Sequence, residues 1–223
     1  MGKRKKSSVQ CYLCGKLTNT ITRDHIPPKS LSPNSSNSLF QYAPACEECN
    51  RKFSHDESKL RDFLAVLRAG SGIAAADDAY EALKRNVNRN AINRADMPHR
   101  DLLRIQEGIE QRETYSPGGI YLGTTKVISP APDIDIQALL VKIARGLHYV
   151  HYHTIIPNEY VMEGHTLKRI PESVAELPIF GNAGDFFHYR GGRLDEDPQC
   201  GIWFMAIYQT IFGMVYFDKP PRF

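Results

Sequence analysis

Residues 11–50 read CYLCGKLTNTITRDHIPPKSLSPNSSNSLFQYAPACEECN, and they hold four of the five cysteines of the chain. The four form two pairs with CxxC spacing, Cys11 with Cys14 and Cys46 with Cys49. In a reducing compartment, paired CxxC units usually bind metal rather than form disulfides. Four thiolates around one ion make a closed tetrahedral site with no position left for water. We therefore predict that these cysteines hold a structural Zn²⁺.

Between the two cysteine pairs lies the segment TRDHIPPKS, residues 22–30. Its two prolines favour an extended exit from a strand that ends near Asp24 and His25. Neighbouring side chains on a strand point to opposite sides, so Asp24 and His25 can contact different partners. Asn50 directly follows the second cysteine pair, in the first turn of an expected helix. Zinc binding would bring the start of that helix near the strand.

The order of CYLC, DHIPPKSL and PACEECNRKF within residues 10–58 resembles the HNH endonucleases, which have the ββα-metal fold. The resemblance implies a zinc-stapled module that hydrolyses phosphodiester bonds of DNA with a catalytic Mg²⁺ or Mn²⁺. By the same resemblance, Asp24 and Asn50 are ligands of that metal, and His25 is the general base for the attacking water. The middle asparagine of the family, which orients the base, has no clean match. Gln41 has the nearest spacing to the second cysteine pair and takes this role in our prediction, while Asn37 would need a small insertion.

The implied chemistry suits these residue types. A neutral imidazole can accept a proton from water near pH 7. A carboxylate and an amide oxygen are hard ligands that suit Mg²⁺, and the metal stabilises the charge that builds on the phosphate. His55 is an alternative late metal ligand, but it lies five residues after Asn50, an awkward offset on one helical face. Candidate phosphate contacts, which can equally be solvated surface, are Lys29, Arg51 and Lys52.

Two other functions remain open. A non-catalytic zinc module that binds nucleic acid or a protein partner would need His25 only as a structural residue or as a substitute zinc ligand. A nuclease that acts on RNA would use the same groups as one that acts on DNA. The family also suggests a setting in host defence or in a mobile element.

The charge distribution is compatible with a nucleic-acid partner. The formal net charge is +3, and residues 1–58 hold nine Lys and Arg against five Asp and Glu. This surplus either faces phosphates or belongs to a solvated basic tail at residues 3–6. No apolar run approaches the roughly 20 residues that span a bilayer, and no apolar segment follows the basic start as in a signal peptide. We expect a soluble, cytoplasmic protein without membrane contact, whose oligomeric state the sequence does not determine.

The whole chain is predicted to be α+β. We expect a basic disordered arm at 1–9, the HNH module at 10–58, a helical segment at 59–114 and an α+β domain of unknown role at 115–223. Helices are predicted from about 56 to 69, 74 to 93, 98 to 112 and 133 to 153, with strands over 120–128 and a strand pair over 200–217. SPGG at 116–119 is a candidate boundary. The histidines of GLHYVHYHT, residues 146–154, are interpreted as a helix end whose imidazoles bond to backbone, in preference to a metal site.

Overall fold

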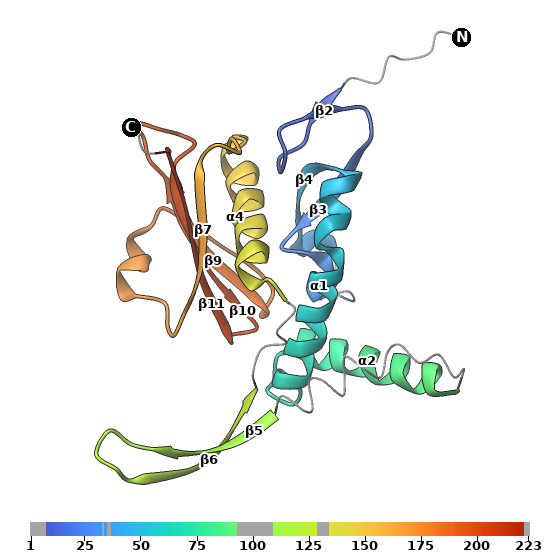
Figure 1. Cartoon of the computed structure of the whole chain (residues 1–223), viewed down its shortest axis with the longest axis vertical. Helices are drawn as coiled ribbons and strands as arrows, with labels where there is room; N and C mark the ends of the chain where they lie inside the picture. Colours follow the sequence, from blue (N-terminus) through green and yellow to red (C-terminus); the bar gives the residue numbers. More distant parts are fainter. Residues whose placement is uncertain (1–7, 33, 35–36, 93–108, 129–133, 221–223) are drawn as a thin grey trace.

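The computed structural model describes residues 8–32, 34, 37–92, 109–128 and 134–220. Within them, the chain is a mixed α+β protein with three α-helices and four antiparallel sheets (Figure 1). None of the helices in these ranges combines the length and apolar character that crossing a bilayer requires. The basic arm predicted at 1–9 falls outside the described residues except for its last two positions.

The N-terminal part contains a β-hairpin followed by a helix. Its elements are β1 (Val9–Gln10), β2 (Leu17–Thr18), β3 (Ile21–Ile26), the 3-10 turns η1 (Lys29–Leu31) and η2 (Asn37–Leu39), β4 (Gln41–Cys46) and α1 (Glu47–Arg68). β3 pairs with β4, and α1 begins directly after β4. Glu47 and Glu48 lie in the first turn of α1, where negative side chains interact favourably with the helix dipole and stabilise the helix. α1 runs without interruption past position 58, so one helix joins the predicted module to the helical segment.

α2 (Ala74–Ile92) packs against α1 and confirms the second predicted helix. Small residues of α2 are buried there, among them Ala75, Ala76 and Ala79, and they lie in the same core as Leu60 and Leu64 of α1. Alanine adds little bulk, so the two helices can lie close together.

A hairpin projects away from the rest of the chain (Figure 1). It consists of β5 (Ile109–Tyr115) and β6 (Tyr121–Ile128), and the SPGG segment forms the turn between them. The strand predicted over 120–128 is therefore confirmed. The helix predicted over 98–112 is wrong for positions 109–112, which pair with β6, while 98–108 lie outside the described residues.

The C-terminal part is a five-stranded antiparallel sheet in the order β7-β11-β10-β9-β8. The strands are β7 (Val161–Leu167), β8 (Ile179–Ala183), β9 (Phe187–Arg193), β10 (Gly201–Ile207) and β11 (Ile211–Asp218), with the 3-10 turn η3 (Glu172–Glu176) before β8. β10 and β11 confirm the predicted strand pair over 200–217. Trp203 and Cys200 are buried.

α4 (Ile136–Tyr152) lies between the N-terminal hairpin and the C-terminal sheet (Figure 1). It contacts β3 and β4 on one side and β7 and β11 on the other, so a single hydrophobic core runs through both parts. Glycines permit these close approaches. A Cβ on Gly146 would lie 2.2 Å from Ile26 of β3, and one on Gly213 would lie 2.5 Å from Leu140 of α4. The helix predicted over 133–153 is thus confirmed as the central element of the fold.

Candidate metal centre and active site

The four paired cysteines form one cluster. Their sulfur atoms all lie within 4.8 Å of one another, and Cys14 Sγ is 3.9 Å from Cys46 Sγ. A tetrahedral zinc with Zn–S bonds of about 2.3 Å requires sulfurs roughly 3.8 Å apart. Burial raises the pKa of the Cys49 thiol, and the neighbouring sulfurs act in the same direction, so four thiolates need a cation to coexist here. The donor set and spacing therefore fit the structural zinc that the sequence predicts.

The alternation of β3 separates the two central predicted residues. Asp24 is buried on the face that meets α1 and α4, whereas His25 is only partly buried on the opposite face. Tyr42 of β4 pairs with His25 across the hairpin, and Ala43 pairs with Asp24. Asp24 and His25 are thus adjacent in sequence but lie on different sides of a two-stranded sheet.

The buried carboxylate of Asp24 is held by groups from two other elements. Lys142 Nζ of α4 lies 3.1 Å from Asp24 Oδ1 and 3.0 Å from Oδ2, and the Tyr12 hydroxyl donates to Oδ2 at 2.7 Å. The same ammonium forms a short hydrogen bond to Glu57 of α1, whose other carboxylate oxygen accepts from Ser30 at 3.4 Å. The result is a buried network of acidic and hydroxyl groups around one lysine.

Burial raises the pKa values of two groups in this network, Glu57 and Tyr12. It raises the pKa of Glu57, while the adjacent Lys142 ammonium acts in the opposite direction. It also raises the pKa of Tyr12 well above the usual range, an effect that the nearby Asp24 carboxylate increases. Tyr12 therefore stays protonated and keeps its role as a hydrogen-bond donor to Asp24.

These contacts do not fit the metal-ligand role that the resemblance implies for Asp24. Both of its oxygens already contact the Lys142 ammonium, and one also accepts from Tyr12. A divalent ion would need the same lone pairs and would be repelled by the ammonium. We therefore do not assign Asp24 as a ligand of a catalytic metal.

Asn50 and Gln41 also contact partners of their own. The Asn50 amide nitrogen donates to the Thr22 hydroxyl at 3.0 Å, so Asn50 lies against the inner face of β3, as does Asp24. The Gln41 side chain lies close to the hydroxyl of Tyr189 in the C-terminal sheet, where it opposes the rise in the Tyr189 pKa that burial causes. The structure thus brings Asn50 and Asp24 to the same side of the hairpin, and it places neither with the His25 imidazole.

His25 lies in an aromatic and basic environment. Its ring centroid is 4.8 Å from that of Tyr42 and 5.6 Å from that of Phe40, which meets it edge-on. Partial burial lowers the pKa of His25, and the positive charge of Lys29 adds to the effect. The imidazole is consequently neutral at pH 7 and can accept a proton. Arg23, on the same face of β3, lies over the Tyr42 ring at 5.9 Å.

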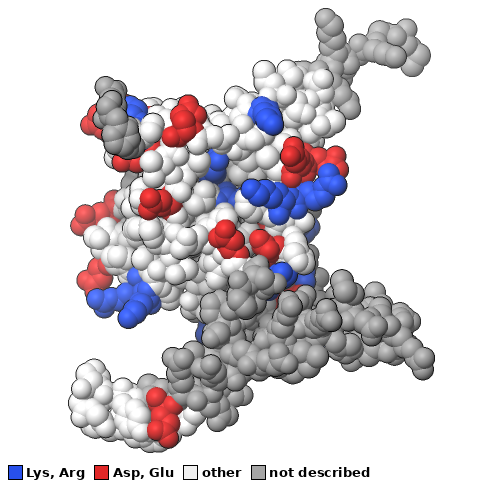
Figure 2. All heavy atoms as spheres, viewed as in Figure 1, with Lys and Arg blue, Asp and Glu red and all other residues white. Residues whose placement is uncertain are grey.

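The candidate phosphate contacts fall in different places. Arg51 is exposed on α1 and pairs with Glu47 at 3.5 Å, and Lys52 lies over the Phe53 ring at 5.5 Å. Lys29 is close enough to His25 to affect its pKa. Figure 2 shows lysine and arginine side chains over the α1 side and others at the centre of the same face. His55, the alternative metal ligand, is exposed on α1.

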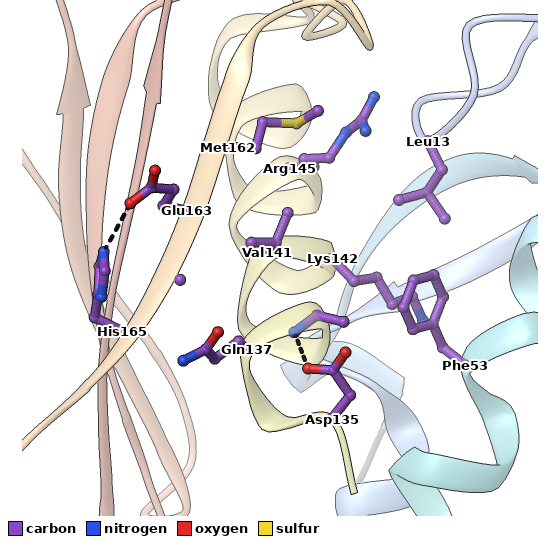
Figure 3. A pocket seen from close by; sticks show the side chains of 12 residues that line it. Leu13, Phe53, Asp135, Gln137, Val141, Lys142, Arg145, Met162, Glu163 and His165 are labelled. Carbon is purple, nitrogen blue, oxygen red and sulfur yellow. Dashed lines mark hydrogen bonds and ion pairs between the residues drawn. The ribbon is translucent and has the colours of Figure 1, made fainter.

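A hollow of about 460 Å³ opens between the two parts of the chain. Figure 3 shows α4 as its floor, β7 on one side, and Leu13 with Phe53 on the other. Its polar groups include Arg145 and Glu163, and a carboxylate oxygen of Glu163 lies 3.3 Å from His165 Nε2. Arg145 donates to the backbone oxygen of Ile156 at 2.8 Å, so it connects the C-terminal half of α4 to the segment that follows the helix.

The prediction that the imidazoles of 146–154 bond to backbone is confirmed for His148 and wrong for His151, which bonds to a side chain. Buried His148 contacts the Pro198 carbonyl through Nε2 at 2.7 Å and the Trp203 indole nitrogen through Nδ1 at 3.4 Å. The neutral tautomer with the proton on Nε2 satisfies both contacts. His151 bonds to the Tyr189 hydroxyl at 3.0 Å. Within the described residues, only the four paired cysteines form a group of metal-binding side chains.

The partners of Asp24 were not predicted from the sequence. One signal was available, because ALLVKIARGL in α4 places Lys142 and Arg145 within an apolar helix. Charged groups at such positions require buried partners, and acidic side chains elsewhere in the chain are the candidates. Which acidic groups they were could not be read from one sequence.

Comparison of the chain with models of known protein families, with curated proteins and with solved structures found no match. The resemblance to HNH endonucleases therefore rests on the motifs and their order.

Proposed function

We propose that this chain is an HNH-type endonuclease that hydrolyses phosphodiester bonds of DNA, with His25 as its general base. The observation that carries the proposal is the position of a neutral, partly exposed His25 on a hairpin that leads directly into α1. The cysteine cluster lies at the junction of β4 and α1, so a metal bound there would fix the hairpin relative to the start of the helix. Lys29 supplies positive charge near the imidazole, and Arg23 lies on the same face of β3 over the Tyr42 ring, so this face favours the approach of a phosphate.

In this proposal, His25 removes a proton from a water molecule that attacks the phosphorus atom. A new P–O bond forms to the water oxygen, the opposite P–O ester bond breaks, and solvent protonates the departing oxygen. A divalent ion, if one takes part, would stabilise the charge on the phosphate. The groups of this chain assigned to the reaction are His25 as base, with Arg23 and Lys29 holding the phosphate.

The test is cleavage of supercoiled plasmid by the zinc-loaded full chain, with Mg²⁺, with Mn²⁺ and without added metal. His25→Ala is compared with His188→Ala, which changes a histidine of β9 that has no assigned role. General-base catalysis typically contributes about 10²- to 10⁴-fold, so His25→Ala is expected to lose at least 100-fold. Equal cleavage by the two variants, with equal zinc contents, would remove His25 from the chemistry.

A non-catalytic zinc module is the second candidate, and the pairing of Asp24 with Lys142 favours it. This alternative predicts that the chain binds DNA or RNA without cutting, that His25→Ala binds as well as the wild type, and that Cys46→Ser does not bind. Parallel cleavage assays on DNA and RNA of the same sequence separate the proposed nuclease from one that acts on RNA.

A further inference from the structure

Asp24 and Glu57 form a buried acidic site that contains one cation of the chain itself. The side chain of Lys142 is 0% exposed, that of Asp24 is 5% exposed and that of Glu57 is 11% exposed. The ammonium contacts both Asp24 oxygens and one oxygen of Glu57. Two carboxylates from β3 and α1 thus converge on a nitrogen from α4.

The donors at this site are the kind that hard divalent ions prefer. Carboxylate oxygens come from Asp24 and Glu57, and hydroxyl groups of Tyr12 and Ser30 complete the surroundings. Mg²⁺ and Mn²⁺ are typically bound by such oxygen atoms. The Lys142 ammonium and a divalent ion would therefore compete for the same carboxylates. Because the fold already holds the ammonium in position, we expect the ammonium to occupy the site.

The packing of α4 keeps Lys142 in place. Leu139, Ile143 and Leu147 are buried in the core on either side of it. A Cβ at Gly146, one turn further on, would lie only 2.2 Å from Ile26, which shows how closely α4 approaches β3. Withdrawing the ammonium would require α4 to leave both layers or would leave two carboxylates buried without a counter-ion.

We propose that Lys142 is the resident cation of the Asp24–Glu57 site and excludes a divalent metal from this face of the hairpin. Asp24 is then a positioning residue that ties β3 to α4. Any metal used in phosphodiester cleavage binds through other groups, on the side of His25 or on the substrate. The inference concerns cation binding alone, so it holds whether or not the chain cleaves DNA.

The test is a titration of the zinc-loaded full chain with Mn²⁺, followed by electron paramagnetic resonance of the free ion. Wild type and Asp24→Asn are expected to bind Mn²⁺ equally, within about twofold. Lys142→Ala is expected to gain one Mn²⁺ site at least tenfold tighter than any site of the wild type. The double variant Asp24→Asn/Lys142→Ala is expected to lose that site again.

Two results would overturn the proposal. One is loss of a Mn²⁺ site in Asp24→Asn compared with the wild type, because Asp24 would then be a metal ligand in spite of Lys142. The other is a folded Lys142→Ala that gains no site. Zinc content and far-ultraviolet circular dichroism report folding, and if Lys142→Ala does not fold, the comparison of wild type with Asp24→Asn decides alone. Failure of plasmid cleavage leaves each of these outcomes unchanged.

Discussion

Replacing Lys142 with methionine should destabilise the protein strongly. Methionine fills a similar volume but leaves Asp24 and Glu57, both largely buried, without their shared ammonium. Breaking a buried ion pair by removing one partner typically costs about 3–5 kcal/mol, because an uncompensated charge remains. Lys142 contacts two carboxylates, so we expect the upper half of that range near pH 7, or about 4–5 kcal/mol. The matched control is Lys84→Met, which breaks an exposed pair on α2 and should cost less than about 1 kcal/mol.

The penalty should depend on pH with a defined sign. Burial raises the pKa of Glu57 and Lys142 opposes that shift, so removing Lys142 raises this pKa further. A carboxyl group whose folded-state pKa is raised contributes stability that is lost as the pH rises through that pKa. The cost of Lys142→Met should therefore grow as the pH rises above 4.5, the ordinary pKa of a glutamate, and adding Glu57→Gln should reduce this dependence.

The assay is urea unfolding followed by circular dichroism at a constant zinc concentration, since any zinc bound by the cysteine cluster would contribute to the measured free energy. Equal slopes with denaturant concentration are needed before the free energies of unfolding are compared. A cost below about 1 kcal/mol for Lys142→Met at pH 7 would refute the reasoning, because it would mean that water or rearrangement replaces the ammonium at little cost.

Three further predictions follow from the core and the zinc cluster. Gly146→Ala should cost about 1–3 kcal/mol in urea unfolding through overlap with Ile26, and it should cost less when it is introduced into an Ile26→Ala background. Burial lowers the pKa of His148 to about 4 from 6.5, so wild type should lose up to about 3 kcal/mol as the pH falls through this window. His148→Gln should lose much less, and equal acid sensitivity would contradict this assignment. Cys46→Ser should abolish tight zinc binding in elemental analysis, whereas Cys200→Ala should retain one zinc per chain.

Local patterns predicted several elements because short-range constraints control them. The apolar periodicity of 136–152 specifies a helix whichever layers it packs against, and the β-branched and aromatic residues on either side of Gln209 favour the strands β10 and β11. The strand at Ile109–Tyr115 was missed because the apolar spacing of 98–112 also fits a helix. Pairing with β6, which a single segment cannot reveal, decides its conformation.

The same division applies to the candidate site. Each CxxC spacing places two sulfurs together within one short turn, so the sequence by itself determined the cysteine pairs that could hold a zinc ion, and only the meeting of the two pairs required folding. Strand alternation likewise determined that Asp24 and His25 face opposite sides. Only the tertiary structure decided what Asp24 binds, because Lys142 lies 118 residues away and reaches it through the packing of α4 between two layers. A buried charge must find a partner, but the sequence does not say which one, since that choice depends on how distant elements pack.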